Sequence, residues 1–194
     1  RRSTNELLFW VASRAHHAEM GGITPGSMPP HSKTLGEEGV LIQNFKVLSQ
    51  TKNRFDELLA ILSSGLYPSR QPETNLSDIQ AQIAANQKGR KELLNAVQSM
   101  SHESVTALLN SICELAAEET RRTMRALPKK HFSFEDFLDC GAKIKVQITI
   151  VDDTATIDFS GTSATLENNL NANRAIVLSA IIYVFRLMIG KDIP

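Results

Sequence analysis

Six glycine and proline residues occur within residues 21–30, and they constrain the fold of this chain more than any other feature. Glycine weakens helices and strands, whereas proline fixes φ and removes a backbone donor. The segment is therefore predicted to be an extended, tightly turning loop. Residues 7–11, which precede it, are apolar and lack a helical period, which predicts a short strand. A loop that follows a strand end is a common place for binding and catalysis.

Three further segments have the patterns of helices. Residues 75–100 begin with a polar cap and continue with apolar residues at helical spacing, and residues 103–127 carry one apolar face and end at Pro128. These two are expected to form an antiparallel hairpin. Residues 175–189 are almost wholly apolar, but the run is shorter than the roughly 20 residues that a bilayer needs and contains Arg186. We expect a helix buried inside a larger protein.

The clearest β signal lies in residues 143–160. Residues 143–150 alternate between polar and apolar side chains, and residues 151–160 follow across an acidic turn, which predicts a β-hairpin. Residues 40–48 are predicted to form a second buried strand. The expected class is therefore α+β, with an antiparallel β-hairpin and short strands packed with a helical hairpin and a buried C-terminal helix.

Composition excludes several classes of protein. The 21 Lys and Arg residues balance 21 Asp and Glu residues among the 194, so neither a nucleic-acid nor a membrane partner is indicated. The two cysteines, Cys113 and Cys140, suggest neither a disulfide framework nor a zinc cluster. The first residues lack the pattern of a secretory signal, and a cytoplasmic location is expected.

The loop carries the residues with the most chemical potential. His16, His17 and Glu19 offer two imidazoles and a carboxylate, which suit either a divalent metal or acid/base catalysis near neutral pH. Because neighbouring side chains diverge, at most one of the two histidines should point into the same pocket as Glu19. From these residues alone, two surface histidines in a polar loop are the more ordinary alternative.

Small polar residues supply candidate substrate contacts. The turn at residues 21–27 could direct backbone N–H groups at an anionic or carbonyl group, and hydroxyls and amides in residues 158–173 could hold a small polar substrate. The predicted substrate-binding residues are Gly21, Gly22, Ser27, Asp158, Ser160 and Asn171. A turn-rich connector is an equally ordinary role for the glycines, and a helix cap is the favoured role for Asn173.

Several motifs, in order and spacing, resemble the hydantoinase B family. They are Ala-Ser-Arg-Ala-His-His-Ala-Glu-Met-Gly-Gly-Ile-Thr-Pro-Gly-Ser-Met-Pro-Pro at 12–30, Glu-Gly-Val at 38–40, Asn-Leu-Ser-Asp at 75–78, Ala-Gln-Ile-Ala-Ala-Asn-Gln-Lys-Gly at 81–89, Ile-Asp-Phe-Ser-Gly-Thr-Ser at 157–163 and Asn-Ala at 171–172. The chain departs from the family at Cys140, where Asp-Asp-Gly is usual, and at Asn173, where Asn-Ala-Pro is usual.

The resemblance implies part of an ATP-dependent hydrolase that opens a cyclic amide, either 5-oxoproline or a hydantoin. In that family the nucleotide is handled by a hydantoinase A-type partner or fused half, which phosphorylates the carbonyl oxygen. We expect the chain to be one part of an oligomer, to continue beyond both ends and to be inactive alone. A component of an ATP-dependent ketone carboxylase and a non-catalytic assembly module remain open alternatives.

The resemblance also assigns roles within the loop. The histidine that matches His16 looks like one ligand of a divalent metal, alongside a His-x-x-Asp element expected upstream of Arg1. His17 and Glu19 are neighbours of that ligand, and Gly21 and Gly22 would shape the same pocket. Residues 1–194 are expected to belong to one hydantoinase B-like domain, divided at 1–74 (strand and site loop), 75–128 (helical hairpin) and 129–194 (β-hairpin and buried helix).

Overall fold

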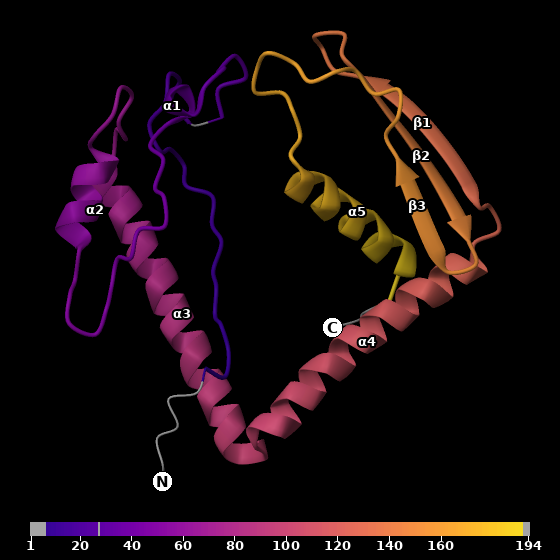
Figure 1. Ribbon diagram of the computed structural model, residues 1–194, viewed down its shortest axis with the longest axis horizontal. Coiled ribbons are helices and arrows are strands. Elements are labelled where there is room, and N and C mark those ends of the chain that lie inside the picture. Colours follow the sequence, from indigo (N-terminus) through magenta and orange to yellow (C-terminus); the bar gives the residue numbers. More distant parts are fainter. Residues whose placement is uncertain (1–6, 27, 192–194) are drawn as a thin grey trace. The chain divides into compact units, whose positions relative to one another are not determined.

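The computed structural model describes residues 7–26 and 28–191, with α-helices and a three-stranded antiparallel sheet (Figure 1). This mixture confirms the predicted α+β class. The chain divides into two compact units. We call residues 1–102 with 167–170 the N-terminal unit, and residues 103–166 with 171–194 the C-terminal unit.

Three helices form the regular part of the N-terminal unit: α1 (Leu35–Glu38), α2 (Phe55–Leu62) and α3 (Pro72–Met100). Helix α3 confirms the predicted helix at residues 75–100 but begins earlier, with Pro72 in its first turn. Proline suits this position because the N–H that it lacks has no partner within the helix there. Leu58 and Leu62 of α2 are buried, and α2 packs against α3. The two short helices were not predicted.

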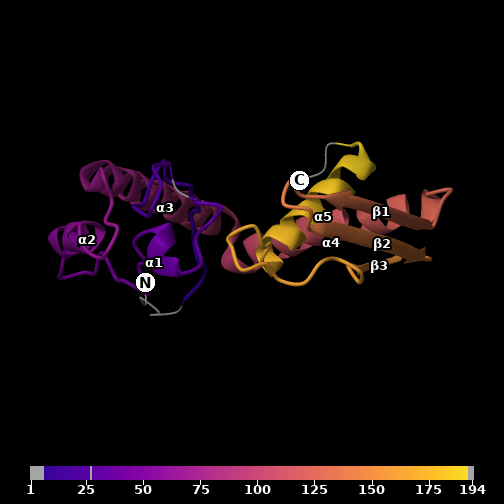
Figure 2. The same cartoon turned by 90° about the horizontal axis from the view of Figure 1, so that it is seen from above.

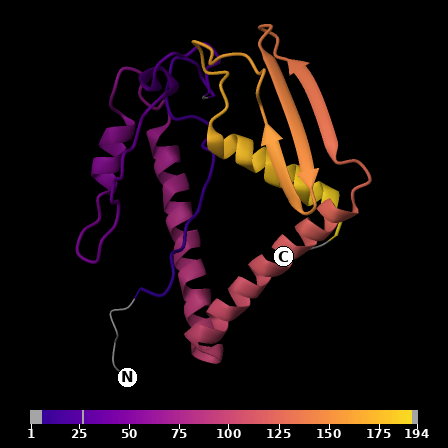
Figure 3. The ribbon, with the colours of Figure 1, turned by 45° about the vertical axis from the view of Figure 1, so that its right-hand side comes forward.

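Residues 7–11 run as an extended segment beside α3 and form no strand, so that prediction was wrong (Figure 3). The segment continues antiparallel to the helix: a Cβ at Gly89 would lie 3.6 Å from Cγ1 of Val11, and Ser13 lies near the carbonyl of Gln82, closer to the helix start. An apolar run shows that its side chains are to be buried against another element, but it does not show whether that element is a strand or a helix.

Residues 40–48 also form no strand, and the prediction of a buried strand there was wrong. Leu48 makes an isolated bridge with Asn53, and Leu41 is 54% exposed. The segment is an irregular connection that leads into α2.

The C-terminal unit contains α4 (His102–Ala126), β1 (His131–Phe137), β2 (Lys143–Val151), β3 (Thr154–Asp158) and α5 (Arg174–Ile189). The β2–β3 pair confirms the predicted hairpin, and α4 confirms the helix predicted at residues 103–127. Strand β1 was not predicted; it pairs with β2 so that Phe132 lies opposite Ile148 and Phe134 opposite Val146. Because α3 and α4 fall mainly in different units, their pairing as a hairpin stays a prediction.

Helix α5 begins where Asn173 accepts a hydrogen bond from the N–H of Ile176 at 3.1 Å, which confirms the predicted cap. One face of α5 lies over the apolar face of the sheet (Figure 2) and shares with it an apolar groove of about 330 Å³. On its other side, Ile182 is 68% exposed and Tyr183 is 64% exposed.

Within this chain α5 is therefore largely exposed, and its burial inside a larger protein stays a prediction. The helix is mostly apolar, and among the described residues of its unit the sheet lines one side of it, while side chains on another side stay exposed. None of the helices in the described residues is long and apolar enough to cross a membrane.

Candidate functional site

The carboxylate of Glu19 fastens the glycine- and proline-rich loop to the start of α3. Its Oε1 accepts hydrogen bonds from the backbone N–H groups of Arg70 at 2.9 Å and Gln71 at 3.2 Å, and lies within hydrogen-bond distance of the Ser69 hydroxyl. Its Oε2 accepts from the N–H of Gly21 at 3.0 Å. The side chain is 13% exposed. These contacts occupy both oxygens, so Glu19 acts here as an anchor of the loop.

The same contacts keep Glu19 ionised. Burial favours the neutral acid and raises the pKa, but hydrogen bonds from the Ser69 hydroxyl and from the N–H groups of Gly21, Gln71 and Arg70 outweigh it. The pKa falls from 4.5 to about 2. The guanidinium of Arg70 lies 3.4 Å from Oε2, so the anchor also contains a cation.

Gly21 and Gly22 allow the backbone to pass close to neighbouring segments of the chain. Both have positive φ, at 88° and 90°, and a Cβ on Gly21 would lie 2.2 Å from the carbonyl oxygen of Tyr67. The N–H of Gly22 donates to that same oxygen at 3.0 Å. Since the N–H of Gly21 is held by Glu19, both donors are used inside the protein. The glycines therefore set the path of the loop.

His17 turns its imidazole towards α3. Its side chain is 13% exposed, with Nε2 at 3.3 Å from Nε2 of Gln82 and Nδ1 at 3.4 Å from Oδ2 of Asp78. The buried Nδ1 makes no hydrogen bond with any residue that the structure describes. Its approach to Asp78 is therefore a close charge contact without hydrogen-bond geometry.

His16 lies in a different environment, because its side chain is exposed. No group of three His, Cys, Asp or Glu side chains suited to a metal occurs within residues 7–26 and 28–191. A divalent cation nevertheless fits the donors at this loop in one respect: the Nδ1 of His17 is a buried nitrogen without a hydrogen bond, and imidazole is a common metal ligand. The chain thus offers single donors, which would need further ligands to complete a site.

The predicted contacts Asp158 and Ser160 are exposed and belong to the C-terminal unit. Hydrogen bonds from the hydroxyl and backbone N–H of Ser160 lower the pKa of Asp158, so the two residues interact with each other in a tight turn. The residues that follow bond to the backbone at the start of β2 without forming a strand. Thr162 Oγ1 accepts from the N–H of Lys145 and donates to its carbonyl, both at 3.0 Å. Ser163 accepts from the N–H of Lys143 through its hydroxyl and donates to the Lys143 carbonyl through its own N–H, both at 2.9 Å.

Asn171 also makes local contacts. Its amide accepts from the N–H of Leu166 and donates to the Leu166 carbonyl, each at 2.9 Å, which closes the loop before α5. Ser27, the remaining predicted contact, lies outside the described residues. The structure thus brings His17, Glu19, Gly21 and Gly22 together near the start of α3, while Asp158 and Ser160 contact each other and Asn171 contacts Leu166 within the C-terminal unit.

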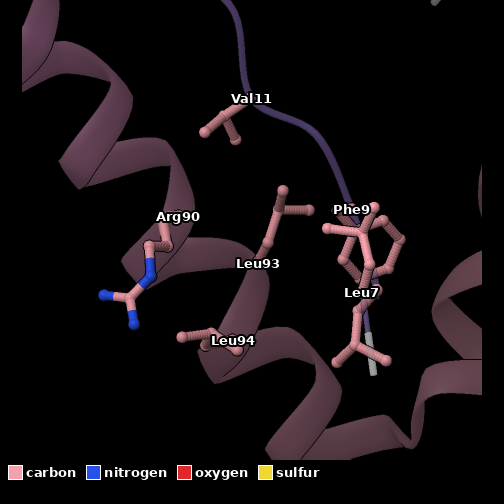
Figure 4. A pocket seen from close by; sticks show the side chains of 7 residues that line it. Leu7, Phe9, Val11, Arg90, Leu93 and Leu94 are labelled. Carbon is pink, nitrogen blue, oxygen red and sulfur yellow. The ribbon is translucent and has the colours of Figure 1, made fainter. Parts of the chain in front are cut away.

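An apolar groove of about 230 Å³ lies between residues 7–11 and α3 (Figure 4). Its labelled lining residues are Leu7, Phe9, Val11, Arg90, Leu93 and Leu94. The groove lies closer to the C-terminal end of α3 than Asp78 and Gln82. Apolar side chains on its two sides keep residues 7–11, which lead to the histidines, beside the helix.

Sequence reasoning missed the partners of the loop on and before α3: Ser69, Arg70, Asn75, Asp78 and Gln82. Besides the contacts above, the side-chain amide of Asn75 donates to the Glu19 carbonyl at 2.7 Å. Asn75, Asp78 and Gln82 are spaced three and four residues apart and so lie on one face of the helix. That spacing is the signal in the sequence that points to a shared face of the helix.

The sequence profile described as Hydantoinase B/oxoprolinase matches residues 2–194. The chain belongs to this family. Among its curated relatives, the chain is 41% identical to 5-oxoprolinase 1 of Arabidopsis thaliana over 97% of its own length, and 40% identical to 5-oxoprolinase of Saccharomyces cerevisiae over 99%. It spans only 17% and 16% of those two proteins. The B component of a putative D-/L-hydantoinase from a Pseudomonas species is 26% identical over 82% of the chain and is covered over 28% of its own length.

The fold of this hydantoinase B/oxoprolinase chain is also similar to a crystal structure of the ATP-dependent caprolactamase from Pseudomonas jessenii. The TM-score is 0.74 at 22% sequence identity, and the match covers 92% of this chain and 31% of the caprolactamase chain. The likeness supports the arrangement of the backbone described above.

Proposed function

We propose that this chain forms part of an ATP-dependent hydrolase that opens a cyclic amide, either 5-oxoproline or a hydantoin. The observation that carries the proposal is the anchored histidine loop: Glu19 fixes the backbone, His16 stays exposed, and His17 keeps a buried nitrogen that makes no hydrogen bond to the described part of the chain. Relatives named as 5-oxoprolinases and as the B component of a hydantoinase support this reaction class.

In this proposal the nucleotide is handled by a hydantoinase A-type partner or half, which activates the amide carbonyl. The present chain contributes the histidine loop, which faces the cyclic amide. One imidazole of the pair serves as a metal ligand or as an acid/base group near neutral pH. A divalent cation held there would polarise the carbonyl oxygen as a Lewis acid.

The two histidines support this role in different ways. His16, which the resemblance favours, has an accessible imidazole. His17 has the stronger geometric support, because its ring is held by α3 and its Nδ1 faces the carboxylate of Asp78, a charge that favours a cation. We therefore propose the histidine pair as the site and His17 as the member whose ring is already oriented.

The test uses the complete enzyme assembled with its A-type partner or half. Ring opening of 5-oxoproline and ADP formation are measured for the native protein, His16→Ala and His17→Ala, with His31→Ala as a control at another exposed loop histidine. We expect a loss of at least about 100-fold in kcat for one member of the pair, as is usual for a general acid or base. Unchanged turnover in both would remove the assigned role.

A second function is favoured by α5. Its outer side chains Ile182 and Tyr183 are exposed apolar surface of the kind that is found at protein interfaces. Such a surface suits an assembly module. Assembly would be the only function left to propose if the histidine variants kept full activity in a stable complex. Product formation that requires bicarbonate would instead favour a ketone carboxylase.

A further inference from the structure

Side chains on one face of α3 contact the loop that carries His17 and Glu19. Asn75 binds the carbonyl of Glu19, and Asp78 and Gln82 contact His17 from the next turns of the helix. A helix is more rigid than a loop, so side chains that it supplies can define the orientation of a group on the loop. The orientation of the His17 ring therefore depends on α3.

Two contacts define that orientation. The amide nitrogen of Gln82 lies 3.3 Å from Nε2 and donates to it when Nε2 carries no proton; with the amide turned over, its oxygen accepts from a protonated Nε2, so Gln82 can match either neutral tautomer. Asp78 places a carboxylate 3.4 Å from Nδ1 on the other side of the ring. The ring is thus held at one nitrogen and has a negative charge beside the other.

We propose that Asp78 and Gln82 are positioning residues that act through His17. Gln82 fixes the ring at Nε2, and the Asp78 carboxylate beside Nδ1 favours a cation bound there. The inference rests on the proposed function, since it assumes that His17 takes part in the site. Residues that orient a ligating histidine typically change metal affinity about 10–100-fold when they are replaced.

The experiment measures Mn²⁺ binding and turnover in the complete enzyme. The variants Asp78→Asn and Gln82→Leu remove one contact each with little change of shape. We expect each to weaken Mn²⁺ binding about 10–100-fold and to lower kcat, with KM for the cyclic amide unchanged. Thermal unfolding is followed in parallel, because a merely structural role would lower Tm without this split between kcat and KM.

Matched controls lie on the same helix. Glu73→Gln removes a negative charge from the first turn of α3, and Gln80→Leu makes the Gln82 change at an exposed position. Both should leave Mn²⁺ affinity and kcat unchanged. If His17→Ala abolishes Mn²⁺ binding and turnover while Asp78→Asn and Gln82→Leu match the controls, the positioning role is overturned and the role proposed for His17 stands. If His17→Ala itself leaves both unchanged, the role proposed for His17 fails with it.

Discussion

Glu19 and Glu57 both have a pKa lowered to about 2, but for different physical reasons. Glu57 is stabilised by hydrogen bonds from Arg54 and Lys52 on the surface, where its side chain is 45% exposed. Glu19 is 13% exposed and is held mainly by neutral donors of the backbone and by Ser69. Water can replace the contacts of Glu57, whereas the donors around Glu19 would be left without an acceptor.

Glu19→Gln should therefore destabilise the fold by about 1–3 kcal/mol, because an amide has only one acceptor oxygen and turns an N–H₂ group towards N–H donors. Urea unfolding provides the measurement. Glu57→Gln is the control and should change the free energy of unfolding much less. Equal effects of the two substitutions would contradict the anchoring role of Glu19.

The pH dependence of stability gives a second prediction for Glu19. Its pKa is about 2 in the folded state and close to 4.5 when unperturbed, so its ionisation stabilises the fold above about pH 4.5. This contribution is lost as the pH falls from about 4.5 towards 2. Urea unfolding at pH 7, 5 and 3 should show the native protein approaching Glu19→Gln in stability at the lowest pH. A constant difference would show that the carboxylate charge is not responsible.

Among the elements, the loop at residues 21–26 depends on glycine where the backbone is crowded. Gly21 and Gly65 both have positive φ, at 88° and 93°, but only Gly21 of these two has backbone atoms within 4 Å of a Cβ position. The pair separates the cost of the backbone conformation from the cost of a steric clash.

Gly21→Ala should destabilise the protein by more than about 2 kcal/mol, because strain at positive φ is joined by a clash with the Tyr67 carbonyl. Gly65→Ala should cost about 1 kcal/mol, which is the backbone strain alone. Thermal or urea unfolding of the two variants tests the difference. Similar losses would show that the loop moves away from residues 67–68 at little cost.

The sequence allowed most of the regular elements to be predicted. Alternation identified the β2–β3 hairpin, helical spacing identified α3 and α4, and a nearly continuous apolar run identified α5, because these patterns are local. The strand expected at residues 7–11 was wrong, since its apolar side chains pack on a helix far along the chain. For the same reason the anchoring of Glu19 was missed: its partners Arg70 and Gln71 lie about fifty residues away in sequence, and no local pattern identifies them.

At the scale of the whole molecule, the outer face of α5 remains the largest departure from what the composition of that helix predicts. Leu178, Ile182 and Tyr183 on this face are 42%, 68% and 64% exposed. A helix that is apolar on every side normally lies inside a larger core. Within its unit the sheet covers one side, so the outer side is available to other apolar surfaces.

The 194-residue chain should therefore bind the hydrophobic dye ANS with a marked rise in fluorescence. Ile182→Ser should reduce this signal, because it replaces one of the most exposed apolar side chains of α5. Val177→Ser, on the face that lines the groove with the sheet, serves for comparison and should lower Tm as well. A signal that Ile182→Ser leaves unchanged would assign the dye to another surface.

The contacts of Thr162 and Ser163 bear on how open the edge of β2 is to pairing with another chain. Where β3 ends, the backbone of β2 at Lys143 and Lys145 would otherwise present free donors and acceptors to any extended peptide. Thr162 and Ser163 make hydrogen bonds to those backbone groups. They do not form a strand to which another chain could add. The turn after β3 thus protects one end of the central strand against templated growth.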